Sequence, residues 1–149
     1  MALWKSLKAK ALLARQLSLR DWFTLTEAWW VLLVFYLVLS RASFKRLEAL
    51  SRSTITEDAC SAGALAAAHR LQRLVHLASR LHWASMTCLI QAFSLRWMAS
   101  RRGIPSEIRI GAAKTAAGMH AHAWVEIAGQ AVGEPADIAE KFIVLTAHE

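Results

Sequence analysis

Cysteine, proline and glycine are scarce in this chain, and each shortage excludes something. Two cysteines in 149 residues do not form a disulfide framework. A disulfide between Cys60 and Cys88 remains an alternative, but we expect free thiols in a reducing cytoplasm. No clean apolar core followed by a small-residue cleavage site marks a secretory signal at the N-terminus. With only two prolines and six glycines, the chain should form long regular segments.

Long apolar runs are also scarce, although hydrophobic residues make up 56% of the chain. The one membrane-like run covers 28–39, and its length falls short of the about 20 residues that a helix needs to cross a bilayer. We expect a buried or partner-facing helix there, with peripheral contact to a membrane as the alternative. The region holds five aromatic residues that should mostly belong to the core, with an exposed docking surface for a partner as the alternative for some of them: Trp22, Trp29, Trp30, Phe35 and Tyr36.

Acidic residues are outnumbered, since 11 Asp and Glu stand against 18 Lys and Arg, for a formal net charge of +7. Such a chain can bind nucleic acid, an anionic membrane or an acidic peptide, and charge alone does not choose among them. No basic motif interleaved with aromatic residues is present, so nucleic acid is not expected as a partner. The arginines Arg70, Arg73 and Arg80 are better explained as a solvated helical face or a surface for an acidic partner.

The hydrophobic pattern changes from a helical period to a period of two after Pro105. Helices are predicted before it over 4–16, from a cap at Ser18 to about 40, over 58–83 behind a capping box at 54–57, and over 88–102. Strands are predicted after it at 107–110, 120–127, 131–132 and 141–146, with a turn or loop at 114–118 and a hairpin turn at 128–130. Helices followed by antiparallel strands indicate an α+β fold.

One domain should hold the whole chain, because 149 residues is an ordinary domain length and no repeat or linker divides it. Within 1–149 we expect a helical portion over 1–84. The portion over 85–149 should contain a Cys-bearing helix packed on a small antiparallel sheet.

Cys88 lies at the predicted start of a helix and is the candidate nucleophile. A helix N-terminus and a paired imidazolium both stabilise a thiolate, and backbone N–H groups at the same place can bind an oxyanion. His122, on the strand predicted over 120–127, is the candidate base. Glu134, beyond the following turn, is the candidate acid that orients the imidazole, with Asp137 in reserve. By composition alone, Cys88 would more often be a packed core residue. The order of Cys88, His122 and Glu134 along the predicted elements favours a catalytic role instead.

Three further residues are candidates for the substrate cleft. His120 and Trp124 share the predicted strand face with His122, and Gln91 lies one helical turn after Cys88. His120 is interpreted first as an exposed strand residue, Trp124 as packing beside the site, and Gln91 equally as a surface or core amide. A His-x-His pair with one distant cysteine is a poor zinc-ligand pattern, so no metal and no cofactor are expected.

Two sequence motifs resemble one known family. The stretch TCLIQAFSLRW at 87–97, followed by RRGIP at 101–105, is similar to the cysteine helix of the lasso-peptide leader peptidases. The stretch HAHAWVE at 120–126, followed by Gly129 and VGE at 132–134, resembles their histidine segment. The likeness is close over about 85–135, and the first half of the chain is similar only in character.

This resemblance implies a transglutaminase-like, papain-like fold, with Cys88 as nucleophile, His122 as base and Glu134 where the family has an acid that is often Asp. It implies a bacterial cytoplasmic enzyme that removes the leader from a ribosomal precursor peptide before a separate macrolactam synthetase closes the ring. Some family members carry a small, strand-rich recognition domain. The helical first 84 residues here imply a separate recognition protein instead. An acyltransferase of the same fold, and a non-enzymatic scaffold that binds a membrane or a partner, stay open as alternatives.

Overall fold

The computed structural model describes residues 17–41, 62–115, 118–135 and 137–144. Three long helices come first: α2 (Leu19–Arg41), α4 (Ala62–Leu81) and α5 (Cys88–Ser100). A short helix and four strands follow: β1 (Glu107–Thr115), β2 (Gly118–Ile127), β3 (Gln130–Ala131), α6 (Ile138–Lys141) and β4 (Ile143–Val144). The helix predicted over 4–16, the capping box at 54–57 and Cys60 lie outside the described residues.

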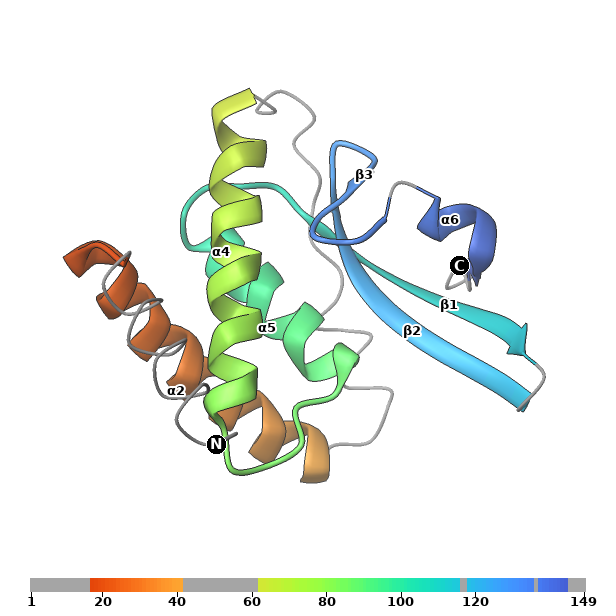
Figure 1. Cartoon of the computed structure of the whole chain (residues 1–149), viewed down its shortest axis with the longest axis horizontal. Coiled ribbons are helices and arrows are strands. Elements are labelled where there is room, and N and C mark those ends of the chain that lie inside the picture. The colour runs from red at the N-terminus through yellow and green to blue at the C-terminus, as the bar shows by residue number, and fades with distance from the viewer. Residues whose placement is uncertain (1–16, 42–61, 116–117, 136, 145–149) are drawn as a thin grey trace, which may run out of the picture.

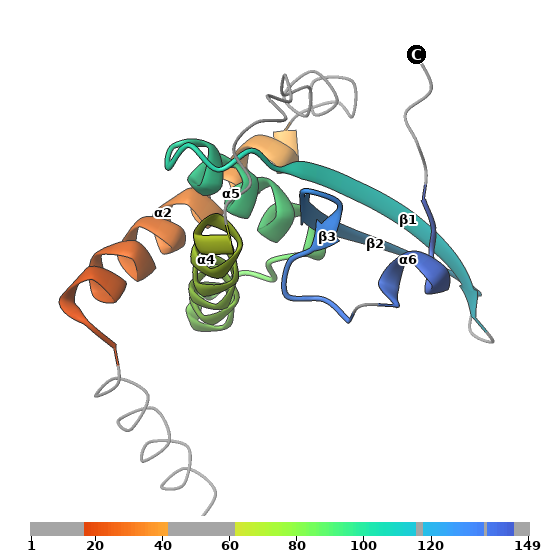
Figure 2. The same ribbon diagram turned by 90° about the horizontal axis from the view of Figure 1, so that it is seen from above.

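The strands form one antiparallel sheet with the order β3-β2-β1-β4. The helices α2, α4 and α5 gather on one side, and the curved β1–β2 hairpin lies on the other (Figure 1). Seen from above, α5 lies between α2 and α4 on one side and the sheet on the other (Figure 2). The fold is therefore α+β, as the change of period at Pro105 predicted.

The capping signal at Ser18 forms as expected. The Asp21 carboxylate accepts hydrogen bonds from the Ser18 N–H at 2.9 Å and from its Oγ at 2.8 Å. The Asp21 N–H donates back to the Ser18 Oγ at 3.3 Å. Because this reciprocal box satisfies donors at the helix N-terminus, α2 begins where the sequence predicted it.

The apolar run at 28–39 lies within α2 and is buried on one face only. Leu25, Ala28, Val31 and Leu32 pack into the core, while the opposite side of the helix is exposed. Two ion pairs also fix α2. Arg70 of α4 bonds Asp21 at 2.7 Å, and Arg102 bonds Glu27 at 2.6 Å.

The core lies where α2, α4, α5 and β2 meet. Leu32, Val75, Met98, Val125 and Ile127 are among its fully buried side chains, and they come from all four elements. Burying side chains of this size contributes about 1.5–3 kcal/mol each. Helix α5 is central, because eight of its thirteen residues are buried. The core therefore fixes the helix that begins with Cys88 against the strand that bears His122.

The bounds of two predicted segments in the sheet differ in the structure. In the turn or loop predicted at 114–118, Lys114 and Thr115 belong to β1 and Gly118 to β2, because Lys114 pairs with Met119 and Thr115 with Gly118. Backbone ladder bonds extend the hairpin past the core, where side-chain alternation gives no signal. Of the strand predicted at 141–146, Ile143–Val144 form β4, while Lys141 ends α6 instead, and 145–146 lie outside the described residues. A helix of four residues is too short to show a helical period.

The hairpin turn predicted at 128–130 forms after β2. Ala128 and Gly129 both have positive φ angles, of 48° and 73°. Positive φ at both central residues matches the twist of a two-residue hairpin. Gln130 and Ala131 then form β3, and the Val132 N–H bonds the Val125 carbonyl at 2.9 Å. The turn brings the chain back beside β2, so that Glu134 approaches the strand that bears His122.

Candidate active site

Cys88 is the first residue of α5. Thr87 caps this helix, with an extended backbone and a side-chain oxygen that accepts from the Ile90 N–H at 3.4 Å. The first regular helical bond runs from the Gln91 N–H to the Thr87 carbonyl at 3.1 Å. The N–H groups at the very start of a helix have no intrahelical acceptor, and the positive pole of the helix dipole favours an anion there. The position therefore suits a thiolate and a nearby oxyanion.

His122 is hydrogen-bonded to Glu134, and 3.0 Å separates His122 Nε2 from Glu134 Oε1. The side chains are 21% and 25% exposed, so water reaches both in part. An ionised carboxylate only accepts hydrogen bonds, and it therefore holds the imidazole proton at Nε2. This leaves Nδ1 of His122 as the nitrogen that can take a proton from another group.

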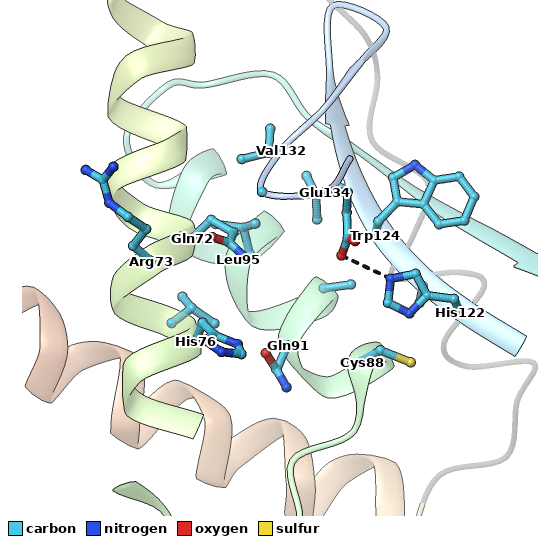
Figure 3. A pocket seen from close by; sticks show the side chains of 15 residues that line it. Gln72, Arg73, His76, Cys88, Gln91, Leu95, His122, Trp124, Val132 and Glu134 are labelled. Atoms are coloured by element: carbon cyan, nitrogen blue, oxygen red, sulfur yellow. Dashed lines mark hydrogen bonds and ion pairs between the residues drawn. The ribbon is translucent and has the colours of Figure 1, made fainter. Parts of the chain in front are cut away.

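One cavity of about 510 Å³ brings the three predicted residues together, since Cys88, His122 and Glu134 all line it. Cys88 and His122 lie on the same side of this cavity, and a dashed line marks the bond between His122 and Glu134 (Figure 3). The cavity opens between α4, α5 and β2 and is bounded above by the segment that follows β3. A thiol, an imidazole and a carboxylate around one cavity can carry out acyl transfer through a thioester.

Trp124 forms part of the wall beside His122. Its indole is 2% exposed, and its ring centre lies 6.1 Å from that of His122 at an interplanar angle of 20°. The indole N–H donates to Glu126 at 2.9 Å, and Arg109 holds the second oxygen of Glu126 at 2.9 Å. Trp124 is therefore a fixed packing partner of the histidine, as one of the two interpretations from the sequence expected.

Comparison with protein families adds an independent finding. The sequence profile described as the transglutaminase-like superfamily matches residues 29–147, which is most of the chain. The chain belongs to the transglutaminase-like superfamily. This superfamily includes cysteine peptidases and acyltransferases, and its fold is typically that of a cysteine-dependent enzyme. Searches among curated proteins and among solved structures gave no significant match.

Asp137, the second candidate for the acid in this transglutaminase-like domain, contacts other residues than His122. The carboxylate of Asp137 binds Lys141 Nζ at 2.7 Å, one turn along α6. This hydrogen bond to Lys141 lowers the pKa of Asp137 below its ordinary value of 3.8. The structure therefore gives Glu134, and not Asp137, as the acid that contacts His122.

Of the other two residues predicted for the cleft, Gln91 lines the cavity and His120 does not. Gln91 lines the cavity and donates from Nε2 to the Met86 carbonyl at 2.9 Å, so that its amide fastens the segment just before Cys88. His120 is exposed, and the described residues that line the cavity do not include it. This agrees with the interpretation of His120 as an exposed strand residue and not with its role in the cleft.

Phe142 is a site neighbour that sequence reasoning missed. Its ring centre lies 5.6 Å from that of His122 and 6.2 Å from that of Trp124. Gly111, which pairs with His122 on β1, makes room for it, because a Cβ there would lie 2.7 Å from the Phe142 Cβ. Only the pairing of β4 with β1 brings Phe142 to this face, and no local pattern signals that pairing.

Helix α4 supplies the wall of the cavity away from the sheet. Gln72, Arg73 and His76 line it there and are labelled on that helix in Figure 3. From the sequence, Arg73 is expected only on a basic helical face. Which turn of α4 faces α5 depends on helix packing, so periodicity alone could not identify these residues. Among the described residues, no group of three or more His, Cys, Asp or Glu side chains could hold a metal ion.

Proposed function

We propose that this chain is a cysteine endopeptidase that removes the leader from a ribosomally made lasso-peptide precursor. The observation that carries the proposal is the convergence of Cys88, His122 and Glu134 on one cavity, with His122 bonded to Glu134. Membership of the transglutaminase-like superfamily supports a cysteine-dependent reaction. The choice of a lasso precursor rests on the motifs at 87–105 and 120–134 that resemble the leader peptidases.

The proposed reaction begins with proton transfer from the Cys88 Sγ to Nδ1 of His122. The thiolate attacks the carbonyl carbon at the leader–core junction, and backbone N–H groups at the start of α5 bind the oxyanion. The imidazolium, stabilised by Glu134, then gives its proton to the leaving amine, which departs with the core peptide. Water, deprotonated by His122, attacks the thioester, releases the leader and restores the thiol.

Two partners follow from this proposal. A separate recognition protein would bind the leader and deliver it to the cavity between α4 and β2. A macrolactam synthetase would then use the amine that the cleavage frees at the start of the core. Both partners act on a ribosomal product, so the proposed location is the cytoplasm.

Incubation with a precursor peptide and its recognition protein, followed by mass spectrometry, tests the proposal. We expect free leader and free core from the wild type and neither from Cys88→Ala. Cys60→Ala is the matched control, and it should cleave as the wild type does.

Each other outcome has a definite meaning. Full cleavage by Cys88→Ala would contradict the assignment of the nucleophile. A product in which the leader is joined to an added amine would identify the acyltransferase instead. Unchanged precursor combined with tight binding to the recognition protein would favour the non-enzymatic scaffold.

A further inference from the structure

Helix α2 presents a row of large apolar side chains to solvent. Seven of its large apolar side chains are exposed: Leu19, Trp22, Phe23, Trp30, Val34, Leu37 and Val38. They recur at intervals of three, four or seven residues, which places them along one side of the helix. The opposite side carries the buried residues that contact α4 and α5. We call these seven residues the α2 stripe.

The exposure of the α2 stripe is too large for incidental surface residues. Phe23 is 79% exposed and Trp30 is 58% exposed. Trp83, just beyond α4 and 75% exposed, lies 6.2 Å from Tyr36 between ring centres and extends the apolar surface. Single exposed apolar residues are ordinary, whereas a contiguous row of them marks a contact surface.

The contacts of α2 argue against a position that crosses a membrane. By length and composition it could span a bilayer, and 22% of its most apolar window is buried. A spanning position would, however, break the ion pair of Asp21 with Arg70 and that of Glu27 with Arg102. It would also remove the buried side of α2 from the core. A helix that lies flat keeps all of these contacts.

The sequence on either side of α2 is basic, which suggests the kind of surface that the stripe contacts. Residues 1–52 contain nine of the 18 Lys and Arg but only three of the 11 acidic residues. Arg20 and Arg41, near the two ends of α2, are exposed. An apolar, tryptophan-bearing helix face with cationic flanks is the pattern of helices that lie in the interface of anionic bilayers. The charge together with the length, apolar composition and exposed tryptophans of α2 favours an anionic lipid surface over a protein partner.

We propose that the α2 stripe docks on the surface of an anionic phospholipid bilayer, with Phe23 and Trp30 among the acyl chains. The cavity of the active site is lined from α4, α5, β2 and the segment after β3, and α2 contributes none of its lining residues. Since α2 lies across α4 and α5 from the β1–β2 hairpin (Figures 1 and 2), docking leaves the cavity open to water. This inference does not depend on the proposed function.

Co-sedimentation of the full chain with lipid vesicles tests the proposal. We expect binding to vesicles of phosphatidylcholine mixed with phosphatidylglycerol, and much weaker binding to pure phosphatidylcholine or at high salt. The double variant Phe23→Ser/Trp30→Ser should bind at least about tenfold more weakly, because two large side chains no longer leave water. The matched control is Met119→Ser/Ile143→Ser, which changes residues that are 75% and 78% exposed on the sheet and should bind as the wild type does.

Three results would overturn the proposal. They are absence of binding to the anionic vesicles, equal binding by the α2 double variant, and equal loss in the sheet control. Light scattering without vesicles adds a fourth, since a dimer that the α2 double variant abolishes would identify a second copy as the occupant. Circular dichroism verifies that each variant is folded. Cys88→Ala should bind vesicles normally, so that failure of the peptidase proposal would be seen separately.

Discussion

Glu134 is placed to control the protonation of His122. Its carboxylate holds the imidazole through the 3.0 Å bond and would stabilise the imidazolium that forms after proton transfer. Glutamine keeps the size of this side chain but not its charge. We therefore expect Glu134→Gln to lower kcat/KM for leader cleavage on the order of 10²-fold, as measured by the rate of core release.

Asp137 provides the control for this prediction. It is an acid three positions further on, and in the structure it binds Lys141. Asp137→Asn should therefore cleave at close to the wild-type rate. An inactive Asp137→Asn together with a fully active Glu134→Gln would transfer the role of third residue to Asp137.

At the residue scale, the sequence predicted the candidate catalytic residues but not the residues that pack around them. The helix cap before Cys88 and the motif around His122 are local patterns, so they could be found without a structure. Phe142 and Gly111 matter because strands β4 and β1 pair, and that pairing joins residues about thirty positions apart. For His120 the sequence left two interpretations, and the structure agrees with the exposed one, because strand alternation gives the face of a side chain but not how far along the face the cavity extends.

At the scale of elements, the segment after β3 positions Glu134 beside His122, and the backbone conformation of this segment requires Gly133. This glycine has a φ of 77°, and a Cβ there would overlap the amide of Gln72 on α4. Gly133→Ala should lose about 1 kcal/mol of stability from the backbone alone. The overlap is with the end of a flexible side chain that lines the cavity and can turn aside, so we expect activity to fall by only about two- to fivefold, through a change in the shape of the cavity. Thermal unfolding and cleavage rates measure the two effects.

Gly129 gives a matched control, since its φ is 73° but nothing lies within 4 Å of the position of a Cβ. Gly129→Ala should show a similar loss of stability with nearly normal cleavage. Adding Gln72→Ala to Gly133→Ala should recover part of the activity, because the overlap is then removed. Equal activity losses in the two glycine variants would argue against a positioning role for the contact with Gln72.

For the whole molecule, the contact between Asp21 and Arg70 links the stability of the helical layer to pH. Hydrogen bonds from Arg70, and then from Ser18, lower the pKa of Asp21 well below its ordinary value of 3.8. A carboxyl group with a lowered pKa in the folded state adds stability above its unfolded pKa, and this is lost as the pH falls through the folded pKa. The free energy of unfolding should therefore decline as the pH falls below about 4.

Asp21→Asn tests this linkage, because asparagine keeps the shape of the cap and carries no charge. The variant should be less stable than the wild type at pH 7 and should show a shallower decline towards low pH in denaturant titrations. Asp137→Asn makes a useful comparison, since Asp137 forms an ion pair within a single short helix and not between helices. A decline of the same steepness in Asp21→Asn and the wild type would show that other carboxyl groups govern the acid response.

The sequence by itself determined what is local: the cap at Ser18, the start of α5 at Cys88, the hairpin turn after β2 and the change from helices to strands. These features depend on residues within a few positions of one another, so short patterns encode them. The tertiary structure alone decided which wall α4 contributes to the cavity, which side of α2 is buried, and that Glu134 and not Asp137 contacts His122. These depend on packing and strand pairing between distant segments. The free energy of such contacts depends on both segments at once, so no single stretch of the chain predicts it.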